Sequence, residues 1–222
     1  MSMPESDRTL KVLEILEKEY PRTSGTYLKF RKPLELLVAT ILSAQSTDEQ
    51  VNRITPRLFE RYRTAADYAD ADTEELEEII RSSGFYHRKA DLVKSAAKQI
   101  VEDFGGEVPG NMEDLLKLKG VARKTANIVL SNAFGVVEGI AVDTHVLRLS
   151  ERLGFSAQKD RDKVEADLMR LYPHEKWHEI NYLLIAHGRA VCDAKKPRCD
   201  LCKVNQMCPS AFKFKHFQNA KK

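Results

Sequence analysis

Four cysteines near the carboxyl end are the residues whose type and spacing point most directly to chemistry. They are all the cysteines in the chain, and six, two and five residues separate Cys192, Cys199, Cys202 and Cys208. Thiols stay reduced inside a cell, so such a group favours a metal site over two disulfides. Four thiolates in so short a segment must bind one centre, either a tetrahedral zinc ion or an iron–sulfur cluster.

The spacing of these cysteines favours the cluster. Zinc sites built from paired cysteines usually have a longer spacer between the two pairs, and this sequence has none. A structural zinc ion stays the alternative, because the softness of thiolate ligands does not separate the two metals.

Positive charge gathers in the same region. Residues 192–222 carry eight Lys and Arg and two Asp, a net charge of +6 in a chain whose total is +3. This asymmetry indicates an acidic partner, most simply a phosphate backbone. We expect residues 212–222 to be a solvated tail.

A second segment suited to chemistry runs from Lys119 to Asn127. Two helices joined by a tight turn here would expose the N–H groups that begin the second helix, and these can bind a phosphate of any nucleic-acid sequence. Lys124 falls in the first turn of that helix, where the helix dipole and the neighbouring Arg123 lower the expected pKa of its amine. Without further information, an ordinary helix connection and a phosphate-contacting lysine remain the alternatives.

Three more polar or aromatic positions stand at the ends of apolar segments. Asp143 precedes an apolar helical pattern and suits an N-cap, and His145 beside it suits a positioning or core role. Gln45 follows the apolar run that starts at Pro33, and Phe85 follows Gly84. Taken alone, the sequence favours Asp143 as a helix cap, Gln45 as a helix C-terminal residue and Phe85 as a core aromatic.

The elements that must position these residues are helical. Apolar residues recur with helical spacing, sustained two-residue alternation is missing, and the pattern predicts about ten helices with short connections. Local signals include Pro33 at one helix start, Asp72 and Glu75 as a capping box, and glycines at helix ends. The predicted class is all-α.

Length and composition are those of an ordinary globular protein. The 222 residues are 42% hydrophobic and 31% charged, which argues against a chain that stays disordered. No apolar run approaches the roughly 18 residues that span a bilayer, and no apolar segment typical of a secretion signal follows the amino terminus. We expect an intracellular protein, in the cytoplasm or nucleoid.

Four of these segments resemble, in order, the motifs of the endonuclease III family of DNA glycosylases. The cysteine spacing is that of the family's four-iron four-sulfur loop. The segment from Lys119 is similar to its helix-hairpin-helix, with Lys119 in place of the usual proline and Ala122 in place of the second glycine. A positive φ at Ala122 would strain the backbone. The segment around Asp143 is similar to the family's aspartate turn, and those of Gln45 and Phe85 to its two loops that enter DNA.

The resemblance implies two helical lobes that flank a DNA-binding cleft. The first, residues 26–137, is a helical barrel-like lobe with the hairpin. The second, residues 1–25 and 138–222, holds the cluster loop at 192–208. The implied partner is double-stranded DNA with damaged bases or abasic sites, and the implied state is a monomer.

The implied activity is a bifunctional DNA glycosylase and apurinic/apyrimidinic lyase that removes oxidised pyrimidines in base excision repair. Lys124 would form a Schiff base with the sugar, and Asp143 would support charge and proton movement. The residues that would contact DNA are Gln45, Phe85, Lys119, Gly120, Ala122, Arg123, Lys195, Lys196 and Arg198. Alternatives are a monofunctional mismatch or adenine-specific glycosylase, whose members typically lack the lysine, and a non-catalytic iron–sulfur DNA-binding or electron-transfer protein.

Overall fold

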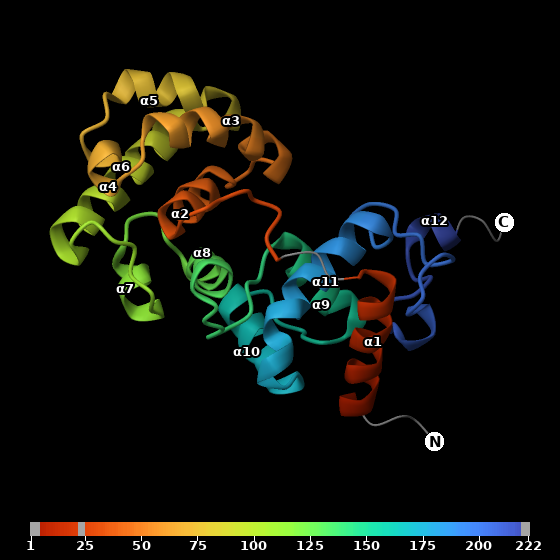
Figure 1. The fold of residues 1–222 in the computed structure, drawn as a ribbon. Coiled ribbons are helices and arrows are strands. Elements are labelled where there is room, and N and C mark those ends of the chain that lie inside the picture. Colours follow the sequence, from red (N-terminus) through yellow and green to blue (C-terminus); the bar gives the residue numbers. More distant parts are fainter. Residues whose placement is uncertain (1–4, 22–24, 219–222) are drawn as a thin grey trace. The chain divides into compact units, whose positions relative to one another are not determined.

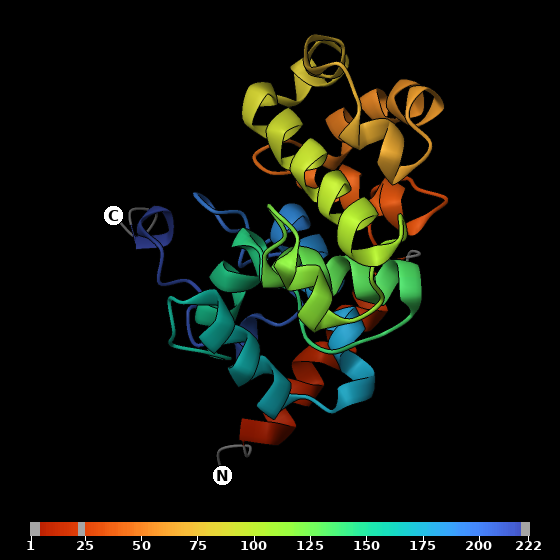
Figure 2. The ribbon, with the colours of Figure 1, turned by 90° about the vertical axis from the view of Figure 1, so that its left-hand side faces the viewer.

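Helices form the regular structure of residues 5–21 and 25–218, the residues that the computed structural model describes (Figures 1 and 2). This confirms the predicted all-α class. The α-helices are α1 (Glu5–Glu19), α2 (Pro33–Leu42), α3 (Asp48–Arg61), α4 (Ala65–Ala69), α5 (Thr73–Ile80), α6 (Tyr86–Phe104), α7 (Met112–Lys117), α8 (Arg123–Val129), α9 (Thr144–Leu153), α10 (Arg161–Leu171), α11 (Trp177–Ala190) and α12 (Lys215–Gln218). Short 3-10 or π segments are η1 (Arg81–Ser83), η2 (Leu130–Phe134), η3 (His174–Lys176) and η4 (Asn205–Met207). In the described ranges, no helix is both long enough and apolar enough to cross a membrane.

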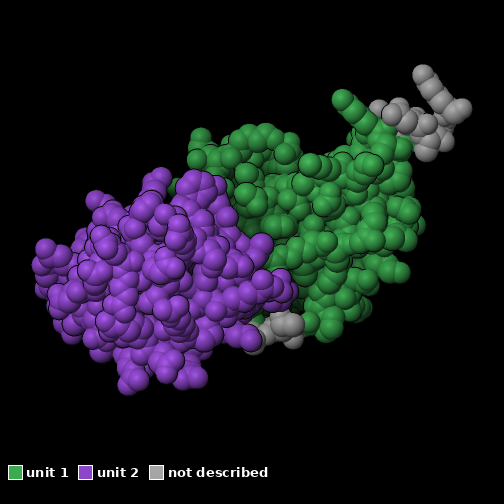
Figure 3. Space-filling view, turned by 90° about the horizontal axis from the view of Figure 1, so that it is seen from above, with its two compact units in different colours: residues 1–25, 139–222 green, residues 26–138 purple. Residues whose placement is uncertain are grey.

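The chain folds as two compact units, which Figure 3 shows in different colours. Unit 1 comprises Met1–Gly25 and Gly139–Lys222, and unit 2 comprises Thr26–Glu138. Each unit has its own apolar core. The amino-terminal helix therefore belongs to the same unit as the carboxyl-terminal half of the chain.

Unit 2 is built on α2, whose sequence is apolar on nearly every face. A helix of that kind is stable only when it is buried, and all of its residues from Leu36 to Leu42 are buried. Helices α3, α6 and α8 pack against it. Pro33 begins the helix, as predicted, because a first-turn residue needs no N–H partner. This core supports the turn after Leu42 and the hairpin between α7 and α8.

Unit 1 is braced by α1, which packs against α11. Arg8 of α1 donates from Nη1 to the carbonyl oxygens of Leu153 at 2.8 Å and Met207 at 3.1 Å. The Tyr20 hydroxyl lies 2.9 Å from Nδ1 of His187 in α11. The first helix thus connects the end of α9 with the carboxyl-terminal loop, although both lie more than a hundred residues after it in the sequence.

The predicted helix ends are confirmed at three glycines. Gly105, Gly135 and Gly154 follow α6, η2 and α9 with φ of 62°, 68° and 69°. Glycine adopts this left-handed conformation without a steric penalty, which is why it ends helices.

The capping box predicted at Asp72 and Glu75 is only half formed. Asp72 accepts a hydrogen bond from the Glu75 N–H at 2.8 Å. The Glu75 carboxylate instead receives two bonds from the guanidinium of Arg61, at 2.7 and 2.8 Å. Glu75 pairs with Arg61 rather than with the Asp72 N–H of a complete capping box, because both hydrogen bonds of the arginine pair are charge-assisted.

Helices α3 and α4 begin at residues for which the sequence analysis named no helix signal. Local signals for both are present. Thr47 accepts from the N–H of Gln50 at the start of α3, and Thr64 and Asp67 form a complete capping box at the start of α4. These caps would have located the two helices.

The expectation of a solvated tail is wrong at Phe214 and His216, whereas Phe212, Lys213 and Lys215 are exposed; residues 219–222 lie outside the described ranges. The Phe214 ring packs under the guanidinium of Arg152, and Nε2 of His216 lies 3.0 Å from the carbonyl oxygen of Pro197. The segment folds back because its aromatic rings can bury against the loop that precedes it.

Candidate active site and cysteine loop

The hairpin between α7 and α8 is a tight turn held from the side by α6. Gly120 adopts φ of 80°, and a Cβ there would lie 3.1 Å from Leu92 of α6. Gln99 of α6 accepts from the Lys119 N–H at 2.7 Å and donates to the carbonyl of Lys117 at 3.2 Å. Glycine is needed here for both its backbone freedom and its lack of a side chain.

The strain considered for Ala122 is absent. Ala122 has φ of −92° and ψ of 167°, which is extended backbone open to any residue. Only Gly120 needs a positive φ in this turn. Replacement of the family's second glycine by alanine is therefore tolerated, and Ala122 stands as the N-cap of α8 with no side-chain cap of its own.

Lys124 lies in the first turn of α8 and is half-buried. Ala126 and Val129 anchor the helix in the core of unit 2. The helix continues as the π segment η2. Single π turns recur near functional sites, and no simple sequence signal marks this one.

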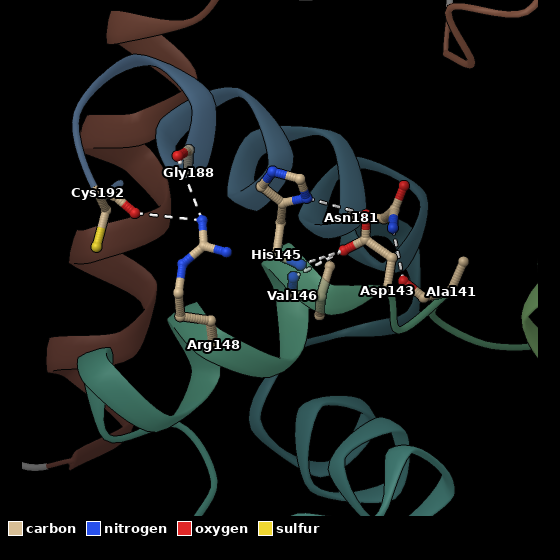
Figure 4. A network of polar contacts seen from close by, with 8 residues as sticks. All are labelled: Ala141, Asp143, His145, Val146, Arg148, Asn181, Gly188 and Cys192. Atoms are coloured by element: carbon tan, nitrogen blue, oxygen red, sulfur yellow. Dashed lines mark hydrogen bonds and ion pairs between the residues drawn. The ribbon is translucent and has the colours of Figure 1, made fainter. Parts of the chain in front are cut away.

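Asp143 caps α9, as its sequence position predicts. One carboxylate oxygen accepts from the N–H groups of His145 at 2.8 Å and Val146 at 2.9 Å (Figure 4). The other oxygen lies 3.3 Å from Nδ1 of His145, and the side chain keeps 21% exposure. Capping thus fixes the orientation of the carboxylate while part of it stays accessible.

Two residues that the sequence analysis did not single out hold the backbone at this turn and at the start of the cysteine loop. Asn181 of α11 is buried and donates to the carbonyl of Ala141 at 2.6 Å. Arg148 of α9 donates to the carbonyls of Gly188 and Cys192, at 3.3 and 3.2 Å. Figure 4 shows both sets of contacts, one at the Asp143 turn and one at the start of the cysteine loop. The sequence signal for Asn181 is an asparagine that stands among apolar residues of a predicted helix, because an asparagine that such a helix buries needs a hydrogen-bond partner.

Gln45 and Phe85 share an unusual conformation in unit 2. Both have left-handed backbones, with φ of 54° and 50°, although neither is glycine. Both side chains are exposed, and Phe85 is 65% exposed, so it is not a core aromatic. Strained backbone at exposed residues is typical of functional sites.

The four cysteines line one small cavity in unit 1, of about 20 Å³. Cys199 is buried and the other three are half-buried. Across residues 5–21 and 25–218, no three His, Cys, Asp or Glu side chains converge as ligands of a single metal ion would. The four cysteines therefore face one shared space.

A set of donors surrounds the cysteine loop. Nη1 of Arg152 lies 3.3 Å from Sγ of Cys192 and donates to the carbonyl of Asp193 at 2.7 Å. Burial lowers the pKa of His187 to about 4 and raises that of Tyr20 to about 12. At neutral pH the Tyr20 hydroxyl therefore donates to Nδ1 of a neutral His187, whose Nε2–H faces Sγ of Cys202 at 3.5 Å.

Burial acts on the thiols as well. It raises the pKa of Cys202 to about 11, and it raises the pKa of Cys208. A thiol of this kind binds a metal only by losing its proton, so loading of the loop releases protons.

The basic residues between the first two cysteines are exposed. The N–H groups of Lys195 and Lys196 donate to Asp193, at 2.8 and 3.1 Å, which holds the pKa of that carboxyl below its usual value. Arg198 donates to the carbonyl of Ala190. These contacts shape the backbone of the loop, and the ammonium groups of the two lysines project from it.

The predicted site residues fall into two groups by unit. Unit 2 holds Lys124 with the hairpin, and the Gln45 and Phe85 loops. Unit 1 holds Asp143 and the cysteine loop, which the contacts of Arg148 and Arg152 connect through α9.

Comparison with known proteins places this chain in a family. Residues 38–174 match the family model described as HhH-GPD superfamily base excision DNA repair protein. The chain is 52% identical to endonuclease III of Synechocystis sp. over 92% of its length and 93% of that protein's, and 49% identical to endonuclease III of Bacillus subtilis over 79% and 80%. It also matches a trapped endonuclease III–DNA covalent intermediate with TM-score 0.89 and 43% identity, covering 95% of this chain and 99% of that one. The chain therefore belongs to the endonuclease III family within the HhH-GPD superfamily of base excision DNA repair proteins.

Proposed function

We propose that Lys124 is the nucleophile and Asp143 the supporting carboxylate of a reaction that removes oxidised pyrimidines from DNA and cuts the strand. As a member of the endonuclease III family, the chain is a DNA glycosylase with lyase function in base excision repair, and its partner is DNA. The observation that carries the assignment of residues is the hairpin, whose glycine turn places Lys124 in the first turn of α8.

The proposed reaction begins and ends with the free amine of Lys124. Its nitrogen bonds to C1′ of the sugar as the bond from C1′ to the damaged base breaks, and the base leaves with a proton. Transfer of the amine's remaining proton to the ring oxygen O4′, as the bond from C1′ to O4′ breaks, opens the ring and gives an imine. Removal of a proton from C2′ then expels the 3′ phosphate by β-elimination. Hydrolysis of the imine returns the free lysine.

Asp143 supports this sequence as a fixed negative charge. Its carboxylate is held by the two N–H groups that it caps, so it needs no reorganisation when positive charge develops on the sugar. Its second oxygen lies 3.3 Å from Nδ1 of His145 and would accept or return a proton during imine formation.

The proposed DNA contacts divide into those that enter the duplex and those that hold phosphates. Gln45 and Phe85 enter the stack: an amide can pair with an orphaned base, and an aromatic ring can stack on one. The phosphate contacts come from Lys119, Gly120, Ala122 and Arg123 in the hairpin and from Lys195, Lys196 and Arg198 in the cysteine loop.

We also propose that the cysteine loop holds a four-iron four-sulfur cluster. A zinc ion needs its sulfurs about 2.3 Å from one point, whereas a cubane cluster gives each thiolate its own iron. The four thiols line one cavity, and their six-two-five spacing without a long spacer suits the cluster better. When bound, the cluster supplies four Fe–S bonds that organise the loop, and the residues that would hold it are Cys192, Cys199, Cys202 and Cys208.

Borohydride trapping tests the nucleophile. Reduction of the imine on a duplex with an abasic site should leave the protein covalently attached to DNA. Lys124→Gln should abolish the adduct and retain DNA binding. Lys117→Gln is a matched control, since Lys117 is an exposed lysine at the end of α7 that pairs with Asp114. An adduct that survives in Lys124→Gln would refute the assignment, and a monofunctional glycosylase would give no adduct in the unaltered chain.

A further inference from the structure

The two exposed loops of unit 2 that carry Gln45 and Phe85 are joined by a direct hydrogen bond. Nε2 of Gln50, in the first turn of α3, donates to Oγ of Ser82 at 2.8 Å. Gln50 lies five residues after Gln45, and Ser82 lies three residues before Phe85. The bond therefore connects the bases of the two loops, and α3 also packs against η1 at this place.

Each loop is also held by contacts of its own. On the first, the Ser46 N–H donates to the carbonyl of Ser43 at 3.1 Å, and Thr47 accepts from the N–H of Gln50 at 3.1 Å. The same residue, Gln50, thus takes part in the cap of α3 and in the bond to the second loop. A shift of Gln45 is in this way coupled to the position of Ser82.

The second loop rests on a buried lysine. Lys89 is only 3% exposed, and its ammonium donates to the carbonyl of Ser83 at 2.7 Å. An ammonium group taken out of water needs such a partner, and its burial lowers the pKa of Lys89. This contact fixes the backbone directly before Gly84 and the left-handed Phe85.

We propose that Gln50 and Ser82 are positioning residues that hold the Gln45 and Phe85 loops at one fixed separation, so that both side chains enter the duplex together. This inference rests on the proposed role of Gln45 and Phe85. Two side chains that act at neighbouring points of one duplex must keep a constant distance. Loops that are already ordered lose less conformational entropy on binding than loops that move independently.

A double-mutant cycle on Gln50 and Ser82 tests the proposal. Gln50→Leu and Ser82→Ala should each lower the single-turnover rate of base removal from duplex DNA by about fivefold, the size expected for one neutral hydrogen bond. The double variant should lose no more than either single variant, because one bond is removed in all three. Ser82→Thr keeps the hydroxyl and should restore most of the rate. Losses that multiply in the double variant would overturn the proposal.

A second readout separates positioning from stability. 2-Aminopurine placed opposite the lesion reports the disturbance of the base pair by its fluorescence. Its rise should be slower in Gln50→Leu and Ser82→Ala, while their melting temperatures fall no more than that of the control variant Arg61→Leu. Arg61→Leu removes the Arg61–Glu75 ion pair at the far end of α3 and serves as the matched control, with an unaltered fluorescence rise expected. Equal slowing in Arg61→Leu would refute the positioning role.

The proposed role of the loops themselves is tested in parallel. Gln45→Ala and Phe85→Ala should slow base removal more than the loss of the Gln50–Ser82 bond does. If these two variants keep the full rate, the loops do not enter DNA and the proposed function fails at this point. If Gln45→Ala and Phe85→Ala slow base removal but the losses of Gln50→Leu and Ser82→Ala multiply in the double variant, only the positioning inference fails.

Discussion

The guanidinium of Arg152 lies 4.7 Å from the centroid of the Phe214 ring, and Nη1 of the same group lies 3.3 Å from Sγ of Cys192. A cation over an aromatic face is attracted by the ring quadrupole. Phe214 also lines the cavity shared by the four cysteines. The segment after Pro209 is therefore part of the wall of the proposed cluster site.

Removal of this ring should make the cluster easier to oxidise. In Phe214→Ala, the visible absorption of the loaded protein should bleach several-fold faster under a fixed dose of ferricyanide, because solvent and oxidant reach the irons more easily. Phe212→Ala is the control, since Phe212 is exposed and does not line the cavity. Equal bleaching rates in the two variants would mean that Phe214 does not shield the cluster.

The metal itself is tested by colour and content. The purified protein should be brown and contain about four irons per chain, each with one thiolate. Cys199→Ser should lose colour and iron, because it removes a buried ligand. A colourless protein with one zinc ion per chain would contradict the assignment.

The two roles of Asp143 can be separated by substitution. Asp143→Asn keeps a good N-cap and removes the charge, so the melting temperature should hardly change while imine formation slows by about 100-fold or more. Asp143→Ala also removes the cap and should lower the free energy of unfolding by about 1 kcal/mol. Single-turnover trapping and thermal unfolding measure the two effects. A full trapping rate in Asp143→Asn would show that the carboxylate serves only as a cap.

Gly120 should tolerate substitution poorly for two separable reasons. Gly120→Ala places a side chain at a left-handed φ and 3.1 Å from Leu92, whereas Gly106→Ala meets only the unfavourable φ, since nothing lies within 4 Å. Gly106→Ala should cost on the order of 1–2 kcal/mol of unfolding free energy, and Gly120→Ala should cost more. Only Gly120→Ala should also weaken DNA binding. Equal losses of stability in both variants would show that the close approach of Leu92 to Gly120 adds nothing to the cost.

Salt dependence tests the phosphate contacts. The logarithm of the DNA association constant should fall linearly with the logarithm of salt concentration, because bound lysines and arginines release counterions. Lys195→Gln and Lys196→Gln should each reduce the slope by about one. Lys98→Gln, at an exposed lysine of α6 paired with Glu102, is the control. An unchanged slope in both variants would mean that Lys195 and Lys196 of the cysteine loop do not contact DNA phosphates.

Local sequence patterns were enough to predict many of the helix ends. Pro33, Gly105 and Gly154 act within one turn of their helices, so their effects are readable from neighbours in sequence. The error at Glu75 arose because its carboxylate is bound by Arg61, which belongs to another helix. The error at the tail has the same origin, since Phe214 packs on Arg152, 62 residues earlier in the sequence.

Residue type and close spacing in the sequence were sufficient to predict the helical class and the cysteine set. Lys124 and Asp143 became candidate reacting residues only through the resemblance of their segments to the endonuclease III family. The sequence did not reveal that Ala122 is unstrained, that Gln45 and Phe85 are held left-handed and exposed, or that Gln50 meets Ser82. Backbone conformation at a turn and contacts between distant segments depend on how helices pack. That packing is a sum of many weak interactions across the whole core, and no short stretch of sequence contains it.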